Sequence, residues 1–161
     1  MPAFDQILAL VKESCAHGEA LPVENTSPKA IQIPSEDLLV VAENLFQNPD
    51  TYFDMLTCVT GIDNGVEADT MECVYTLYSI PFNSQLMLKV VLPRANPEID
   101  SISHIWKSAN WLEREIFDMY GIHFKNHPDL RRILLPGDWE GHPLRKDYKQ
   151  QEYYRGVKVE S

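Results

Sequence analysis

The sequence is short of the residues from which cross-linked, metal-binding and membrane-spanning proteins are built. Its three cysteines, Cys15, Cys58 and Cys73, are widely spaced and form no CxxC pair. That spacing argues against disulfides and against a zinc or iron–sulfur site made by this chain alone. No apolar run approaches the roughly 20 residues that cross a bilayer, and no basic, signal-like segment opens the chain. We therefore expect a protein that stays on the cytosolic side of the membrane.

Basic residues are almost missing from the first half of the chain. Residues 1–80 contain 13 Asp and Glu against 2 Lys and Arg, whereas residues 81–161 contain 11 against 12. An acidic half repels nucleic acid, so we expect no nucleic-acid partner. Residues 122–161 hold 8 basic and 6 acidic residues, which suits an acidic partner surface. That the acidic half is simply a solvated face stays open.

Motifs of catalysis and nucleotide binding are also missing. The sequence has no GxGxxG, GxxxxGKS/T, GxSxG or HExxH. Four histidines, His104, His123, His127 and His142, lie in the second half, but none forms HxH. His127 and His142 each precede a proline and are expected to shape turns. We predict no catalytic, cofactor-binding or metal-binding residue on this chain.

Apolar residues recur at helical spacing in three stretches. They predict helices over residues 3–16, 36–47 and 97–121. Ser35 is placed as the N-cap of the second helix. Asn110 is a candidate break in the third, and Gly121 a left-handed residue at its end. The segment 19–28 contains two prolines and is predicted to be a loop.

Four runs are typical of strands: residues 30–33, 52–62, 70–80 and 85–92. Asp63-Asn64-Gly65 is a hairpin signal between the second and third runs. From Met71 to Tyr78 apolar residues alternate with more polar ones, so one face of that strand is more apolar than the other. The sequence therefore predicts an α+β fold of two layers, in which helices pack on one side of an antiparallel or mixed sheet.

After Gly121 the chain is broken by prolines and glycines. Five of them fall between residues 128 and 143 and exclude long regular elements. We predict an α+β domain over residues 1–121 and an extended C-terminal tail over residues 122–161. Such a tail cannot bury itself, so we expect it to lie on another protein. Candidate contacts are its aromatic and basic residues Arg131, Arg132, Trp139, Arg145, Lys146 and Tyr148.

Glu113, Arg114 and Glu115 lie on the predicted helix just before the tail. Helical positions two apart point about 200° away from each other, so the two glutamates cannot share a substrate and an acid–base pair is not expected. We expect a charge network instead, in which Arg114 reaches Asp118 or the tail and each acid has its own basic partner. Glu113 is equally compatible with a position that faces solvent. This network would fix the direction in which the tail leaves the domain.

The block from Glu113 to Leu134 resembles the signature of the C subunit of NADH–quinone oxidoreductase, the 30-kDa peripheral-arm subunit of respiratory complex I. The matching residues are Glu113, Arg114, Glu115, Asp118, Met119, Tyr120, His127, Arg131, Ile133 and Leu134. The stretch Gly141 to Tyr148, which includes His142, also resembles the family's tail. The resemblance covers about residues 30–148.

The resemblance implies a two-layer α+β domain with a long C-terminal extension and no redox centre. FMN and the iron–sulfur clusters would then belong to partner subunits, and electrons would pass from NADH to quinone without touching this chain. The implied partners are the quinone-site subunit (the D subunit) and the cluster-bearing B and I subunits. The implied location is peripheral, on the cytoplasmic side of the inner (cell) membrane, which the chain would meet only through the complex.

Other functions fit the same resemblance. One is the equivalent subunit of a ferredoxin-fed, photosynthetic-type complex or of a membrane-bound nickel–iron hydrogenase. Genes for NADH-binding subunits beside this one would favour the NADH-fed complex over these relatives. A free-standing enzyme with an unrecognised site is a further alternative, and turnover by the isolated chain would favour it.

Overall fold

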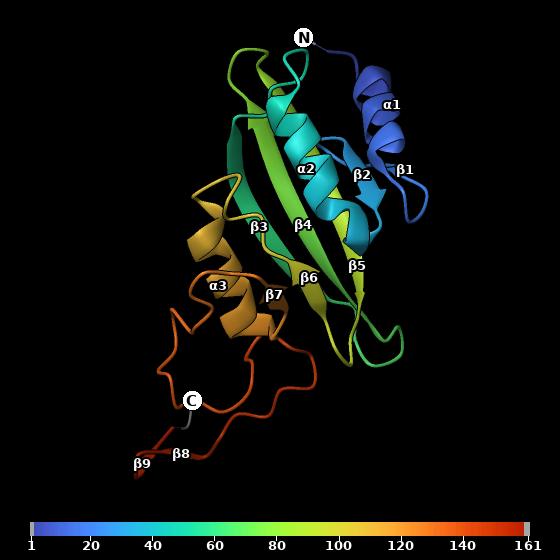
Figure 1. The fold of residues 1–161 in the computed structure, drawn as a ribbon. Coiled ribbons are helices and arrows are strands. Elements are labelled where there is room, and N and C mark those ends of the chain that lie inside the picture. The colour runs from blue at the N-terminus through green and yellow to red at the C-terminus, as the bar shows by residue number, and fades with distance from the viewer. Residues whose placement is uncertain (1, 160–161) are drawn as a thin grey trace.

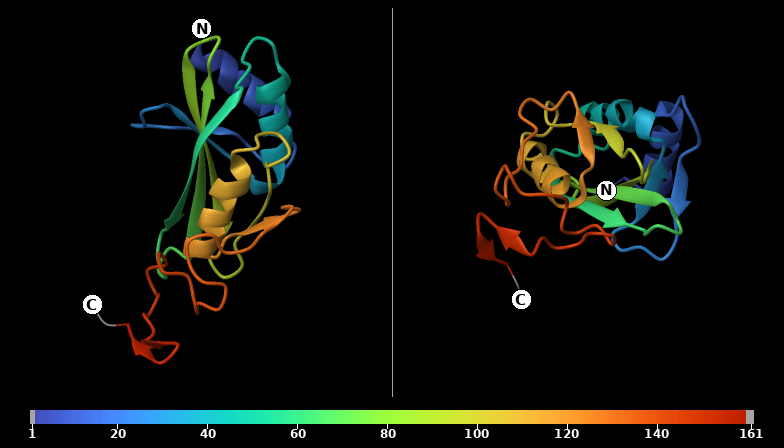
Figure 2. Two further views of the ribbon diagram at one scale, coloured as in Figure 1. Left: turned by 90° about the vertical axis from the view of Figure 1, so that its left-hand side faces the viewer. Right: turned by 90° about the horizontal axis from the view of Figure 1, so that it is seen from below.

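The computed structural model describes residues 2–159, in which three helices cover one face of a five-stranded sheet (Figure 1; Figure 2). The helices are α1 (Phe4–Ser14), α2 (Leu38–Gln47) and α3 (Ala109–Tyr120), and a 3-10 turn η1 (Ser35–Asp37) leads into α2. The strands of this sheet are β1 (Leu21–Val23), β2 (Ala30–Ile33), β3 (Met55–Asp63), β4 (Thr70–Ser79) and β5 (Ser84–Pro93). Four short strands follow: β6 (Glu98–Asp100), β7 (His123–Lys125), β8 (Tyr153–Tyr154) and β9 (Val157–Lys158).

The large sheet is mixed. Its strand order is β1-β2-β5-β4-β3, with β3, β4 and β5 as an antiparallel meander and β2 parallel to β5. Successive side chains of β4 point to opposite faces of the sheet. Met71, Cys73, Tyr75 and Leu77 are all 0% exposed, so the face that they share carries the core. The predicted α+β class, with helices on one side of a mixed sheet, is confirmed.

The apolar spacing of the segment 97–121 predicted one long helix, and this prediction is wrong. The first part of the segment forms β6, which pairs with β7 in parallel, and then a series of turns. Ile99 and Ile102 are buried there as strand and turn residues. The helical spacing of these isoleucines was therefore a coincidence, and only Ala109–Tyr120 is helical.

Two smaller expectations about the N-terminal half are also wrong. The segment 19–28 contains β1, which adds an antiparallel edge strand beside β2. Ser35 is not an N-cap, because its hydroxyl donates to Glu36 and the chain first makes the 3-10 turn η1. Pro34 precedes this turn in an extended conformation.

The hydrophobic core continues past residue 121. Ile122 is 0% exposed and Phe124, in β7, is 1% exposed. The division into a domain and a tail at residues 121 and 122 stays a prediction, and we keep the name "tail" for residues 122–161. After β7 the tail runs beneath α3 and ends in the small β8–β9 hairpin, away from the sheet (Figure 1). Within residues 2–159 no helix combines the length and hydropathy needed to cross a bilayer.

Candidate functional site

The tail is fastened to the domain at Asp118, a fully buried residue of α3. Its Oδ2 accepts three backbone N–H groups of the tail, from Ile133 at 3.1 Å, Leu134 at 2.8 Å and Leu135 at 2.9 Å. Its Oδ1 accepts a hydrogen bond of 2.7 Å from Nη1 of Arg132. One carboxylate therefore holds four successive residues of the tail in place.

Arg132 carries this connection further along the tail. Its Nη2 donates to the backbone oxygens of Trp139 at 2.9 Å and Gly141 at 2.8 Å. Burial alone would raise the pKa of the Asp118 carboxyl, but the backbone N–H of Leu135, Arg132 and the other N–H donors outweigh it and hold that pKa below its ordinary value. Asp118 is thus a charged anchor for the tail.

Arg114 also reaches the tail. It donates to the backbone oxygens of Arg131 and Arg132, each at 3.1 Å. A network that folds back onto the tail was predicted, but its acidic centre is Asp118. Glu115 is exposed and has no charged partner among the described residues.

A second anchor lies at the end of β3. Asp63 binds Arg94 through Nε at 2.8 Å and Nη2 at 3.1 Å, and it accepts the backbone N–H of Lys146 at 2.8 Å. Arg94 also contacts Asp147 at 2.6 Å. The hydrogen bond from Arg94 holds the pKa of Asp63 well below its usual range. We define the clamp as the two carboxylates Asp63 and Asp118 with their contacts to the tail.

Sequence reasoning missed the Asp63 anchor. In the sequence Asp63 shows only as part of a hairpin signal, whereas in the structure Gly65 N–H and Arg94 both donate to its Oδ1. Arg94 lies 31 positions and Lys146 lies 83 positions from Asp63. No local pattern connects residues so far apart, so only the folded chain reveals the contact.

Glu113 does not face solvent, contrary to the alternative left open above. It is 0% exposed, and its carboxyl accepts hydrogen bonds from Ser101 Oγ at 2.6 Å and Ile102 N at 2.8 Å. Burial raises its pKa to about 7, against the opposing effect of these two hydrogen bonds. Glu113 thus joins α3 to the turn after β6. Because Glu115 points outward, the two acids share no substrate, as the helical geometry predicted.

His127 packs beside Glu113 at the start of the irregular part of the tail. Its Nε2 lies 3.7 Å from Glu113 Oε2 and 3.0 Å from the backbone oxygen of Asn110. Its Nδ1 accepts the backbone N–H of Asp129 at 3.0 Å. An imidazole that accepts at Nδ1 donates at Nε2, so His127 connects α3 to the turn that follows β7.

Several predicted contact residues are used inside the tail. Trp139 Nε1 donates to Tyr148 Oη at 3.1 Å, and its ring lies 5.2 Å from that of Tyr154. His142 contacts the backbone oxygen of Asp118 through Nδ1 at 2.9 Å and packs against Gly121. These side chains shape the tail whether or not they also touch a partner.

The predicted basic contacts differ in how accessible they are. Arg131 is paired with Asp129 at 2.9 Å, with its side chain 71% exposed. Lys146 is also exposed. Arg145 is partly buried and lies near Asp147 at 3.4 Å. Arg131 and Lys146 are therefore the more available of these basic groups for a partner.

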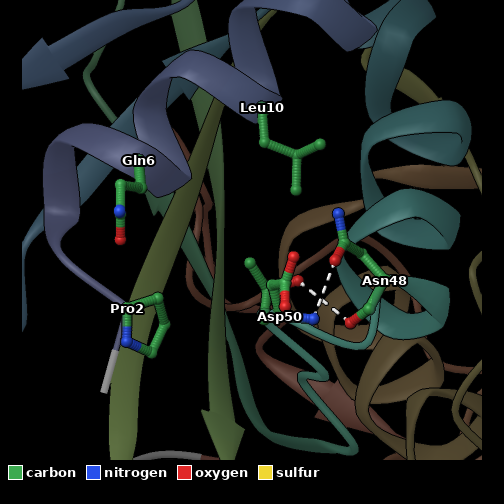
Figure 3. Close-up of a pocket in the computed structure, with 6 residues that line it drawn as sticks. Pro2, Gln6, Leu10, Asn48 and Asp50 are labelled. Atoms are coloured by element: carbon green, nitrogen blue, oxygen red, sulfur yellow. Dashed lines mark hydrogen bonds between the residues drawn. The ribbon is translucent and has the colours of Figure 1, made fainter.

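A hollow of the surface lies between α1 and the turn after α2 and is lined by Pro2, Gln6, Leu10, Asn48, Asp50 and Thr51 (Figure 3). Asn48 accepts the backbone N–H of Asp50 there and so closes the turn. Among the described residues no group of three or more His, Cys, Asp or Glu is arranged to hold a metal ion.

Comparison with known sequences points to one family. A family model described as "Respiratory-chain NADH dehydrogenase, 30 Kd subunit" matches residues 31–154. A similar protein from Trichlorobacter lovleyi, named as the C subunit of NADH-quinone oxidoreductase, is 48% identical over 131 residues, which cover 78% of this chain and 80% of the relative. A relative of the same name from Citrifermentans bemidjiense is 40% identical over 160 residues, 97% of this chain and 98% of the relative.

Solved structures agree with this result. The chain resembles a trypsin-resistant fragment (1-134) of Nqo5 with a TM-score of 0.58 and 27% identity, covering 69% of this chain and 89% of that one. It also resembles a chain of the membrane-bound sulfane sulfur reductase, an archaeal respiratory membrane complex, with a TM-score of 0.68. That match covers 90% of this chain and 85% of the other at 19% identity, so it shows the fold alone.

Proposed function

Because the chain belongs to the family of the respiratory-chain NADH dehydrogenase 30-kDa subunit, and so is a peripheral-arm subunit of NADH–quinone oxidoreductase, we propose that its task is structural. In this role it holds neighbouring subunits together and transfers no electrons itself. The clamp is the observation that carries the proposal. Two buried carboxylates hold the tail in a defined course through contacts within the chain itself, and preorganisation lowers the entropy lost on binding.

The proposed partners are the quinone-site D subunit and the cluster-bearing B and I subunits. FMN and the iron–sulfur clusters belong to partner subunits in this proposal, and none to this chain. The exposed basic groups of the tail, Arg131 and Lys146, support contact with acidic surfaces. The proposed location is peripheral, on the cytoplasmic side of the cell membrane.

The comparisons favour the NADH-fed complex over the two alternatives. The relatives from Trichlorobacter lovleyi and Citrifermentans bemidjiense are both named as the C subunit of NADH-quinone oxidoreductase. The likeness to the sulfane sulfur reductase concerns the fold and carries no functional argument. A ferredoxin-fed complex or a nickel–iron hydrogenase is therefore not favoured.

Truncation tests the proposal that the tail is the anchor. A chain lacking residues 131–161 loses every tail contact of Asp118 and Asp63, whereas one lacking residues 149–161 keeps them. We expect the first to remain folded by circular dichroism but to lose co-purification with a co-expressed quinone-site D subunit. The second is the matched control and should still co-purify. Normal assembly of the first chain would show that the tail is not the anchor.

A second test separates a structural from a chemical role. Arg114→Ala removes the two hydrogen bonds to tail carbonyls, and Glu115→Gln removes an exposed charge. We expect less assembled complex for Arg114→Ala, with near-normal quinone reduction per assembled complex. A complex that assembles fully but has lost turnover would mean that this block takes part in the chemistry.

A further inference from the structure

An open groove lies far from the clamp, where β3 begins. Its volume is about 660 Å³, and its lining includes Phe46, Met55, Ile80, Ile105, Trp106 and Lys107. The clamp residue Asp63 ends the same strand. A strand of nine residues spans roughly 25 Å, at about 3.3 Å per residue. The groove and the Asp63 anchor of the clamp therefore lie at opposite ends of β3.

The groove presents apolar side chains to solvent beside an aromatic pair, Phe46 and Trp106. Ile80 is 58% exposed and Met55 is 44% exposed. Below them the ring of Phe46 meets Trp106 edge-on at 5.8 Å, and Trp106 Nε1 donates to the backbone oxygen of Phe53. A preformed apolar recess of this kind is typical of a docking site.

Lys107, on the rim, is the one basic residue before the tail that has no partner among the described residues. The others each contact an acid, a ring or a backbone carbonyl: Lys12, Lys29, Lys89, Arg94 and Arg114. The acid on the same rim, Asp54, accepts the backbone N–H of Ile80 at 2.9 Å. An unpaired ammonium group beside an apolar recess complements an apolar segment that carries a carboxylate.

We propose that this groove is a second docking site, which binds an apolar segment of a neighbouring subunit with an Asp, a Glu or a terminal carboxylate against Lys107. The inference rests on the proposed function, because it assumes that the chain works inside a complex. It adds a second contact at the end opposite the tail. The chain then bridges two neighbours across the length of its sheet.

Cysteine labelling tests whether the groove is covered. Ile80→Cys is compared with Val40→Cys, an aliphatic position on α2 that is 49% exposed, in a chain whose accessible Cys15 and Cys58 are replaced by Ser. Both cysteines should react with a maleimide in the isolated chain. In the purified complex we expect Ile80→Cys to react at least about tenfold more slowly than Val40→Cys. Equal rates in the complex would overturn the proposal.

Charge variants test the chemistry of the occupant. Lys107→Glu is expected to lower recovery of the complex by at least about fivefold at low salt, whereas Lys107→Arg, which keeps the charge, should recover it within about twofold. Equal recovery of the two variants would overturn the proposal. Protection of Ile80→Cys in the isolated chain, rising with its concentration, would show that a second copy fills the groove and would overturn it too. If the unchanged chain fails to co-purify with the complex, the proposed function fails, independently of the groove.

Discussion

At the scale of single residues, two buried carboxyl groups of α3 respond to pH in opposite directions. Within residues 2–159 the nearest basic group to Glu113 is His127, and burial dominates and raises the pKa of Glu113 to about 7. Asp118 is equally buried but accepts three backbone N–H groups and Arg132, which together lower its pKa. Five positions apart on one helix, one acid favours the protonated state and the other the charged state.

Glu113 makes the domain less stable as the pH rises. Its pKa is raised in the folded state, from 4.5 to about 7, so its contribution is fully present below pH 4.5 and is lost as the pH rises through 7. A shift of this size is worth roughly 3 kcal/mol. We expect Glu113→Gln to flatten the decline in unfolding free energy between pH 5 and pH 8, measured by urea denaturation. An unchanged slope in the variant would contradict this assignment.

Asp118→Asn is expected to loosen the tail without unfolding the sheet. The variant keeps the size of the side chain but removes the charge that Arg132 and three N–H groups share. Hydrogen bonds to a charged group are worth roughly 1.5–3 kcal/mol each. The amides of residues 133–135 should exchange with deuterium at least about tenfold faster, while those of β4 stay protected. Asp129→Asn, which removes the charge of an exposed pair with Arg131, is the control. It should change the exchange rates of neither set of amides.

At the scale of elements, the four strands β2, β3, β4 and β5 could be predicted, and the end of the core could not. The alternation on β4 is a local pattern, and burial of every second residue confirms it. The β6–β7 pair joins residues about 25 positions apart, and β7 has only three residues, too few for periodicity to register. The helical spacing of apolar residues over 97–108 therefore led to a predicted helix where the structure has a strand and turns.

The end of α3 was predicted correctly, because Gly121 carries its own signal. It caps the helix in the left-handed region, with φ of 75°, and a Cβ there would lie 2.6 Å from the ring of His142. We expect Gly121→Ala to destabilise the protein by about 1–2 kcal/mol in chemical denaturation, because it strains the cap and displaces His142. Gly137→Ala, where a Cβ meets nothing within 4 Å, should cost far less. Equal losses for the two would show that the cap and the His142 contact are unimportant.

At the scale of the whole molecule, the tail was predicted as a partner-binding extension whose exit from the domain a charge network fixes, but its two carboxylate anchors were not predicted. Sequence composition shows that residues 122–161 cannot form long regular elements. It does not show that Asp63 and Asp118 hold them, because these contacts depend on where β3 and α3 meet the returning chain. The predicted residues that the structure gathers around the clamp are Arg114, Asp118, Arg132, His142 and Lys146.

The isolated chain is expected to fold without iron, zinc or flavin. Its three cysteines remain unpaired thiols, and burial raises the pKa of Cys73 to about 12, which leaves that thiol a poor ligand. Metal analysis of the purified chain and its visible absorption spectrum should show no stoichiometric metal or flavin. A stoichiometric amount of either would contradict the proposal that all redox centres belong to partner subunits.

Acid should release the tail before it unfolds the domain. The pKa values of Asp63 and Asp118 are lowered in the folded state, so the clamp is at full strength above the ordinary pKa of about 3.9 and weakens as the pH falls through the folded-state values. Glu113 acts in the opposite sense, so its share of domain stability is retained in acid. The two effects therefore run in opposite directions: a fall in pH weakens the clamp, whereas a rise in pH toward 7 removes the stability that Glu113 contributes.

Energy transfer between dyes at Val40→Cys and Lys149→Cys, in a chain free of other accessible cysteines, reports this release. We expect constant transfer from pH 7 to pH 5 and a fall below about pH 4, where circular dichroism still shows a folded sheet. The double variant Asp63→Asn, Asp118→Asn should show low transfer already at pH 7, because neither anchor carries its charge. If transfer and circular dichroism fall together at every pH, the tail has no separate clamp and belongs to the same cooperative unit as the sheet.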